Sequence, residues 1–191
     1  IGHQVEREQL FQRLSAANAE LATHAATDAL TGLPNRRAFL EGLRRMLAQG
    51  QRDGTGVLVA FVDLDGFKKI NDLHGHETGD DFLVEIARRL HGTLRAGDLL
   101  ARLGGDEFVV VLPDVEGAND AAHVAGKIIE DVARSLRVGA HELHTSASIG
   151  ISLYPDDGET VPTVMQNADT AMYHAKAIGR NNFQFFASAM N

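Results

Sequence analysis

The segment that decides the fold runs from Leu99 to Leu112 and reads LLARLGGDEFVVVL. Its apolar residues predict two strands, Leu99–Leu103 and Glu107–Leu112, joined through Gly104-Gly105 as a hairpin. Glycine adopts positive φ angles without a steric penalty and lets a ligand approach the backbone closely. Asp106-Glu107 follows at once, which is unusual for a purely structural hairpin, although a solvent-facing tip would also explain it. Because neighbouring strand residues point to opposite faces, we expect the two acids to differ in role.

A second acidic segment, Asp63-Leu64-Asp65, directly follows the apolar run Val57–Val62. The run predicts a strand that is buried on both faces. Residues two apart on a strand face the same way, so both carboxylates could look into one site. Carboxylates suit hard cations such as Mg²⁺, which usually binds one or two of them together with substrate phosphates. A strand ending in solvated aspartates would look the same, but two acidic tips from separate segments favour a metal site.

The remaining pattern predicts an α+β fold, with a mixed central sheet flanked by helices on one or both faces. The turn residues Thr31–Asn35 mark the start of the globular domain. Thr78 is the expected N-cap of a helix that follows the first strand. The expected helices span 36–48, 78–94, 118–136 and 163–178, and the further strands span 144–153 and 183–186.

An N-terminal helix is expected over residues 4–27. Leu10, Leu14, Ala17 and Leu21 recur at steps of four and three, which is the pattern of a heptad seam. Two interpretations stay open: an amphipathic helix docked on the domain, or a helix from an upstream domain that pairs with its twin. The expected units are therefore a helical linker at 1–27, a domain at 28–186 and the start of a C-terminal linker at 187–191.

The composition excludes several classes of site. The net charge of −8 argues against a broad nucleic-acid surface, which would need an excess of Lys and Arg. There is no cysteine, so disulfides and thiolate metal sites are excluded. The apolar runs are too short to span a bilayer. Since the chain begins at Ile, we expect a segment of a longer protein, located in the cytoplasm or forming the cytoplasmic part of a membrane-bound sensor.

Gly104-Gly105-Asp106-Glu107-Phe108 is identified as the signature of the GGDEF family of diguanylate cyclases, and the chain resembles that family from about residue 28 to 186. The resemblance implies a nucleotidyl-cyclase or ferredoxin-like sheet that condenses two GTP into cyclic di-GMP and releases two pyrophosphates. No Walker A pattern is present, so GTP would be held in another way. The other matching motifs are Asp28-Ala29-Leu30-Thr31, Asp63-Leu64-Asp65, Asn71-Asp72, Gly75-His76, Gly79-Asp80, Ala175-Lys176 and Gly179-Arg180-Asn181.

The resemblance implies roles for individual residues. Two ions of Mg²⁺ or Mn²⁺ per active site would be held by Asp63, the Leu64 carbonyl, Asp106 and Glu107. The expected catalytic residues are Asp106, Glu107 and Lys68. The expected substrate-binding residues are Asn71, Asp80 and His76 around guanine, Lys68, Lys176, Arg180 and the Phe67 backbone around the triphosphate, and Arg102. An aspartate accepts from the N–H donors of guanine, and an amide both donates and accepts.

Arg95-Ala96-Gly97-Asp98 matches the RxxD motif at which bound product inhibits many members of the family. An arginine can stack on guanine and bind its Hoogsteen edge, although a helix-terminal Arg beside a turn Asp is common in any protein. The resemblance further implies a homodimer, because each domain holds one GTP, and an upstream sensory domain. Residues 183–191 resemble a linker that leads into an EAL domain. The alternative function is a catalytically silent module that binds GTP or cyclic di-GMP.

Overall fold

The computed structural model describes residues 2–190, with the side chains of Thr23 and His24 left out. Residues 1 and 191, the outer ends of the two expected linkers, lie outside this range. The helices are α1 (Gly2–Ala26), α2 (Arg36–Asp53), α3 (Phe67–His74), α4 (His76–Thr93), α5 (Ala118–Ala133), α6 (Val161–Ala177) and the 3₁₀ turn η1 (Ser188–Met190). The strands are β1 (Gly56–Asp65), β2 (Leu99–Gly104), β3 (Glu107–Val115), β4 (Leu136–Val138), β5 (His141–Leu143), β6 (Ser146–Tyr154) and β7 (Asn182–Phe185).

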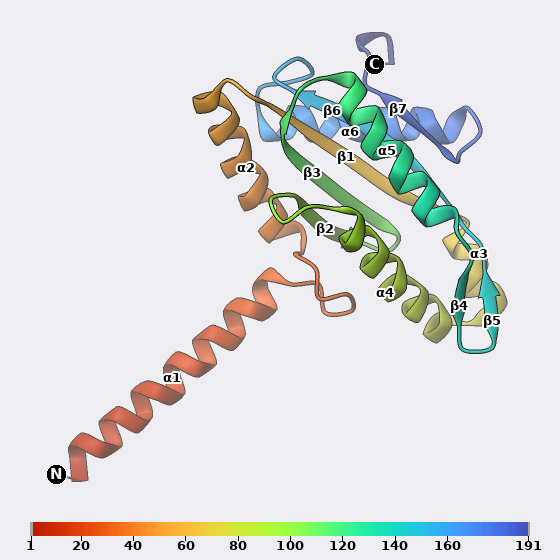
Figure 1. The fold of residues 1–191 in the computed structure, drawn as a ribbon. Coiled ribbons are helices and arrows are strands. Elements are labelled where there is room, and N and C mark those ends of the chain that lie inside the picture. The colour runs from red at the N-terminus through yellow and green to blue at the C-terminus, as the bar shows by residue number, and fades with distance from the viewer. Residues whose placement is uncertain (1, 191) are drawn as a thin grey trace.

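A five-stranded mixed sheet forms the centre of the domain, in the order β2-β3-β1-β6-β7. β1 lies between β3 and β6 and is antiparallel to both, whereas β7 runs parallel to β6. Eight consecutive residues of β1, Val57–Leu64, are buried, because helices cover both faces of the sheet (Figure 1). The expected α+β class, with a mixed sheet flanked by helices, is confirmed.

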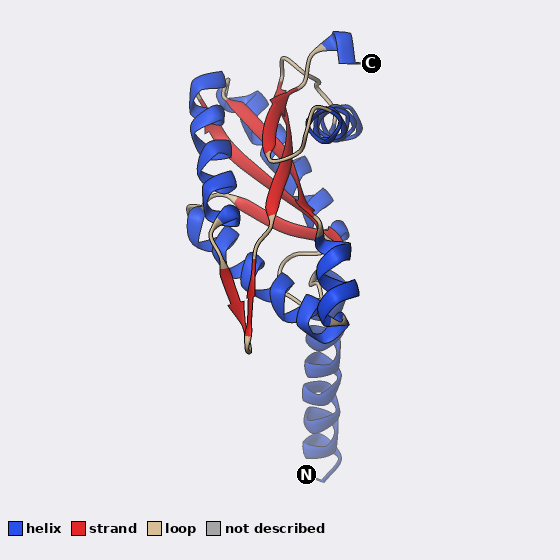
Figure 2. Cartoon of the chain, turned by 90° about the vertical axis from the view of Figure 1, so that its right-hand side faces the viewer, coloured by secondary structure: helices blue, strands red, loops and turns tan. Residues whose placement is uncertain are grey.

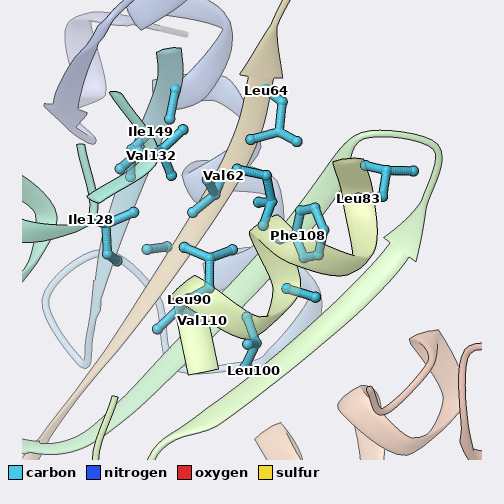
Figure 3. Packing of buried hydrophobic residues seen from close by; sticks show 14 of the residues in the cluster. Val62, Leu64, Leu83, Leu90, Leu100, Phe108, Val110, Ile128, Val132 and Ile149 are labelled. Carbon is cyan, nitrogen blue, oxygen red and sulfur yellow. The ribbon is translucent and has the colours of Figure 1, made fainter. Parts of the chain in front are cut away.

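The alternation of side chains along β1 divides the core into two layers. Even-numbered residues such as Val62 pack against α4 and α5, and odd-numbered residues such as Phe61 pack against α2 and α6. The first layer is the larger one, and the side chains drawn in Figure 3 show how Leu83 and Leu90 of α4 meet strand residues such as Val62. Because Asp63 continues the odd series, its side chain faces α6 rather than α4.

A close approach between α6 and β6 positions the helix over that face. A Cβ atom on Gly150 of β6 would lie 2.7 Å from the Cα of Met172 in α6, which leaves no room for any side chain. Only glycine permits this contact. Since α6 is held this tightly at Met172, its last turn, which contains Lys176, lies next to the end of β1.

Several elements differ from expectation. The eight-residue α3 was not predicted, and α4 begins at His76 after the positive-φ residue Gly75, so the expected N-cap at Thr78 is wrong. The short hairpin of β4 and β5 was also not predicted; it forms a second, two-stranded sheet. Helix α3 and the β4–β5 hairpin are both too short to show a clear hydrophobic period in the sequence. The helix predicted to 136 ends at Ala133, where the chain turns into this hairpin.

Helix α1 projects away from the sheet, with its N-terminus far from the domain (Figures 1 and 2). Its described side chains from residue 2 to 22 are exposed, including Leu10, Phe11, Leu14 and Leu21. The docked arrangement is therefore not the one found. Across residues 2–190, no helix combines the length and the apolarity needed to cross a membrane.

Candidate active site

Asp63 lies at the end of β1 and is only 4% exposed. Its carboxylate receives a hydrogen bond from the Lys176 ammonium group of α6, 113 residues away along the chain. This contact requires the sheet register and the docking of α6 together, since neither residue is near the other in sequence. A nearly buried carboxylate is stable in its ionised form only beside such a charge.

The turn between β2 and β3 brings Asp106 to the same point. Gly104 and Gly105 both have positive φ angles, 145° and 49°, which tighten the turn. The Leu64 N–H donates to the backbone carbonyl of Asp106 at 3.2 Å, so the two acidic segments are joined through their backbones. The Asp63 and Asp106 carboxyl groups lie close enough to interact directly.

This arrangement changes the proton affinity of Asp106. Burial, followed by the charge of Asp63 and the hydrogen bond with it, raises the pKa of Asp106 to about 6, although Lys176 opposes the shift. Two carboxylates in contact repel each other unless a proton or a cation lies between them. The pair is therefore built to receive positive charge.

Glu107 stands directly opposite Asp63 in the β1–β3 ladder. Burial, and then the charges of Asp63 and Asp169, raise its pKa, while Lys176 and Arg36 lower it. Along β3, the odd-numbered Val109 and Val111 pack on the α2/α6 side, which places Glu107 on the same side. Glu107 is thus close to the Asp63–Asp106 pair; β3 begins at Glu107, so Asp106 lies in the turn, and the different role expected for Glu107 stays a prediction.

The donors at this point fit a hard divalent cation. Asp63 and Asp106 offer carboxylate oxygens, the Leu64 backbone lies beside Asp106, and the Lys176 ammonium already supplies a cation on Asp63. Within residues 2–190, no group of three or more acidic or histidine side chains could hold a metal by itself. A site with so few protein ligands suits Mg²⁺, which commonly completes its coordination shell with substrate phosphates and water.

Asp65 shares the face of Asp63 but has other partners. Its carboxylate accepts from the hydroxyl groups of Ser146 and Ser148 at 2.6 and 2.7 Å, and from the backbone N–H of Asn181 at 3.1 Å. These bonds tie the loop after α6 to the end of β1. Arg180 in that loop has a φ of 62° and is exposed. The loop thus holds its arginine in a sparsely populated backbone conformation, with Arg180 Nε 4.0 Å from Oδ1 of Asp65.

The corner between α3 and α4 lies beyond the end of β1. The backbone N–H of Gly75 donates to the carbonyl of Asn71 at 2.8 Å and closes this corner. The Oδ1 atom of Asn71 is buried without a hydrogen-bond partner. His76 at the start of α4 and Asp80 one turn later are exposed, as is Lys68 at the start of α3. A buried oxygen without a donor costs about 1–3 kcal/mol, so the Asn71 carboxamide lies here without the stabilisation of a hydrogen bond to that oxygen.

Arg102 of β2 is engaged within the protein. Its guanidinium donates to both carboxylate oxygens of Asp28 and to the carbonyl of Gly105. Its side chain is largely buried in this contact. The substrate-binding role expected for Arg102 stays a prediction, and the contact with Asp28 was not foreseen from the sequence.

Arg95 and Asp98 lie at the opposite end of β2 from the Gly-Gly turn, about 20 Å away by strand length. The Asp98 carboxylate accepts from the Arg95 backbone N–H at 2.7 Å, which shapes the loop. Both residues line a pocket of about 310 Å³ that is also lined by His123 and Lys127 of α5. The sequence alone did not single out these two residues, because α5 is far from the motif along the chain.

Comparison with known proteins identifies the family. The sequence model described as "Diguanylate cyclase, GGDEF domain" matches residues 25–182. The chain belongs to the GGDEF domain family. This confirms the resemblance that the motifs indicated.

This GGDEF domain is 48% identical over 182 residues to the bifunctional diguanylate cyclase/cyclic di-GMP phosphodiesterase MucR of Pseudomonas aeruginosa, covering 95% of the chain and 26% of MucR. It is 44% identical over 179 residues to the diguanylate cyclase TpbB of P. aeruginosa, covering 93% of the chain and 41% of TpbB. The chain therefore spans less than half the length of these relatives.

A solved structure resembles the GGDEF domain together with helix α1. The coiled coil and GGDEF domain of DgcB from Caulobacter crescentus, in complex with c-di-GMP, matches with a TM-score of 0.86 at 30% identity. The match covers 96% of this chain and 97% of the DgcB chain. The fold described above is therefore the fold of the family.

The structure brings part of the expected site into contact. Asp63, Asp106, Glu107 and Lys176 are neighbours, and Leu64 is joined to Asp106. The nucleotide-binding roles expected at the α3–α4 corner, at Phe67 and Lys68, and at Arg180 stay predictions. Besides the contact of Arg102 with Asp28, the sequence missed the ion pair between Asp63 and Lys176, because no periodicity links a strand end to a helix 113 residues later.

Proposed function

We propose that this GGDEF domain is a diguanylate cyclase that condenses two GTP into cyclic di-GMP. Membership of the family supports cyclic di-GMP synthesis in general terms. The observation that carries the proposal for this chain is the pair of Asp63 and Asp106 carboxyl groups, which meet beside Lys176 at the end of β1. A purely structural domain has no need for this pair, since like charges in contact are unfavourable.

Asp63, Asp106 and the Leu64 carbonyl would hold Mg²⁺ or Mn²⁺, with Glu107 as a further ligand or as a proton acceptor. When bound, two such ions would neutralise the triphosphate and lower the pKa of the attacking hydroxyl. Lys176 would then move from Asp63 to the phosphates, together with Lys68 and Arg180. Lys68 and Arg180 are exposed and lie at the start of α3 and in the loop after α6.

The base would be read at the α3–α4 corner. The carboxamide of Asn71 and the exposed carboxylate of Asp80 would supply the hydrogen-bonding groups, with Asp80 accepting from the N1–H and N2–H groups of guanine. His76 begins α4, one turn before Asp80. Adenine lacks these donors, so Asp80→Ala should lower the preference for GTP over ATP. An unchanged preference would contradict this assignment.

The reaction forms a bond from the 3′-oxygen of one GTP to the α-phosphorus of the other and breaks the bond to the β-phosphate oxygen, which leaves with pyrophosphate. Glu107 would accept the proton of the 3′-hydroxyl. A second, reciprocal step closes the ring. Because one domain presents one nucleotide site, two domains must face each other across a two-fold axis. The exposed apolar residues of α1 support a pairing of two copies.

The proposal is tested by incubating the chain with GTP and Mg²⁺ at several protein concentrations and separating the products by chromatography. Cyclic di-GMP should form, and the rate per chain should rise with concentration as dimers assemble. Omission of the divalent cation is the control for metal dependence. Binding of GTP without product at any concentration would favour the alternative, a silent regulatory module.

Product inhibition is a further part of the proposal. The pocket at Arg95 and Asp98 contains Lys127, whose charge suits a phosphate of the cyclic dinucleotide. Product bound there would hold the domains in an arrangement in which two GTP sites cannot meet. In the longer protein, an upstream sensory domain would act through α1, and an EAL domain would follow as in bifunctional relatives.

A further inference from the structure

A glycine in the first part of α4 lies directly against the candidate guanine reader. Gly79 is buried, and a Cβ atom on it would overlap the Oδ1 atom of Asn71 and lie 2.9 Å from its Cγ. The next nearest atom, Cε2 of Phe67, would be 3.5 Å away, which is an ordinary contact. The carboxamide of Asn71 thus occupies the space that a side chain at position 79 would fill.

The backbone gives no other reason for glycine at this position. Gly79 has helical geometry and is absent from the glycines with positive φ among the described residues. Within a helix, glycine is less favourable than alanine by about 1 kcal/mol. Alanine would therefore fit the backbone and stabilise the helix, and the single obstacle is the side chain of Asn71.

The Asn71 side chain has no protein donor that would hold it there. Its Oδ1 is buried without a partner, while its backbone carbonyl accepts from Gly75. The backbone of Asn71 is therefore fixed by the corner, but the carboxamide is placed mainly by the space over Gly79. A methyl group at position 79 would displace the flexible end of Asn71 and leave the fold intact.

We infer that Gly79 is a specificity-determining residue of the guanine site: its missing side chain holds open the space in which Asn71 presents its amide to the base. This inference rests on the proposed function, in which Asn71 reads guanine. It assigns the base preference of the domain to a residue without any polar group. The role is one of positioning, since Gly79 acts on the base through Asn71.

The test is a double-mutant cycle of Gly79→Ala and Asn71→Ala, with Gly92→Ala as the matched control. Gly92 lies in the same helix, and a Cβ atom there would meet nothing within 4 Å. For each variant, kcat/KM is measured with GTP and ATP, and the affinities of non-hydrolysable GTP and ATP analogues are measured by calorimetry. Thermal unfolding shows whether each variant is folded.

Gly79→Ala should lower the GTP-over-ATP ratio by about tenfold or more, as should Asn71→Ala, because a hydrogen bond to the base is lost in each case. The double variant should be no worse than Asn71→Ala alone, because no amide remains to be displaced. Gly92→Ala should keep the parent ratio, and both glycine variants should melt at or above the parent temperature.

The outcomes separate this inference from the proposed function. If Asn71→Ala loses discrimination and Gly79→Ala keeps it, the inference about Gly79 is wrong and the guanine site stands. Additive losses in the double variant would also overturn it. If the parent binds both analogues equally, or if Asn71→Ala keeps the parent preference, the guanine assignment itself is wrong and the inference falls with it.

Discussion

The Arg102 guanidinium donates from Nη1 to both carboxylate oxygens of Asp28, at 2.9 and 3.1 Å, and from Nε to the Gly105 carbonyl at 3.0 Å. Arg102 thereby joins the loop that follows α1 to the turn that presents Asp106. The same loop is tied to α1 by Asn35, whose Nδ2 donates to the Ala25 carbonyl at 3.0 Å. A continuous set of contacts therefore runs from the end of α1 to the turn that carries Asp106.

Replacement of Asp28 by Ala should destabilise the domain by about 1–3 kcal/mol at neutral pH, because a largely buried guanidinium loses its partner. Burial alone would raise the pKa of Asp28, but hydrogen bonds from Thr31 and Arg102 outweigh it and hold that pKa below 3.8. Stability from a lowered pKa is present above 3.8 and is lost as pH falls through the folded-state value.

Urea unfolding of the parent and Asp28→Ala, at neutral pH and below pH 3.8, measures this effect. The difference in the free energy of unfolding between the parent and Asp28→Ala should be smaller in acid than at neutral pH. Asp53→Ala, which removes an exposed carboxylate at the end of α2, is the control and should change stability by less than about 0.5 kcal/mol. A difference that stays constant with pH would rule out the ion pair as its source.

Replacement of Asp63 by Asn should abolish cyclic di-GMP formation, by about 100-fold or more, because a cation ligand is lost while the volume of the side chain is kept. The melting temperature without metal should not fall strongly, since the repulsion with Asp106 is removed along with the charge. Product formation and thermal unfolding are the two measurements. Near-normal turnover would show that Asp63 does not serve the reaction.

The raised pKa of Asp106 predicts how the stability of the metal-free protein depends on pH. The folded state holds the proton up to about pH 6, whereas the unfolded state releases it near 3.8. The free energy of unfolding from this group therefore decreases as pH rises between these values. Urea unfolding should show this decrease in the parent and its loss in Asp106→Asn. Identical pH profiles would mean that another group is responsible.

Product inhibition should weaken when Arg95 is replaced by Ala. The variant loses both the positive charge and the planar set of N–H donors with which the guanidinium would bind guanine. Initial rates are measured against added cyclic di-GMP, and the inhibition constant should rise at least about tenfold. Lys127→Ala should act in the same direction if the α5 side of the pocket contributes. Superimposable inhibition curves would remove Arg95 from the site. A parallel loss of the initial rate would point to a structural role.

Two serines on β6 should respond oppositely to replacement by alanine. Ser148 donates to Asp65, whereas the Ser152 hydroxyl is fully buried without a hydrogen-bond partner. Ser152→Ala should leave the free energy of unfolding unchanged or raise it by about 1 kcal/mol. Ser148→Ala should lower it by about 1–2 kcal/mol. Chemical denaturation compares them, and equal losses would indicate that the Ser152 hydroxyl has a partner.

The long elements could be predicted from the sequence. The apolar run Val57–Val62 indicated a buried strand, and Gly104-Gly105 between apolar segments indicated the hairpin, because such patterns depend on local periodicity and local φ preferences. The resemblance to the GGDEF family, carried by the separate motifs Asp63–Asp65 and Gly104–Phe108, predicted that Asp63 and Asp106 belong to one site. The short α3 and the β4–β5 hairpin escaped, since each is too short for a period to appear.

Sequence by itself thus determined the family, the order of the main strands and helices, and the acids of the candidate site. Only the tertiary structure decided which charges meet: Lys176 on Asp63, Arg102 on Asp28, and the Asn71 amide over Gly79. These contacts depend on sheet register and on the seating of helices, which are set by the packing of the whole core rather than by any local pattern. The role inferred for Gly79 cannot be predicted from the sequence, because it depends on the side chain of Asn71 that lies against it in space.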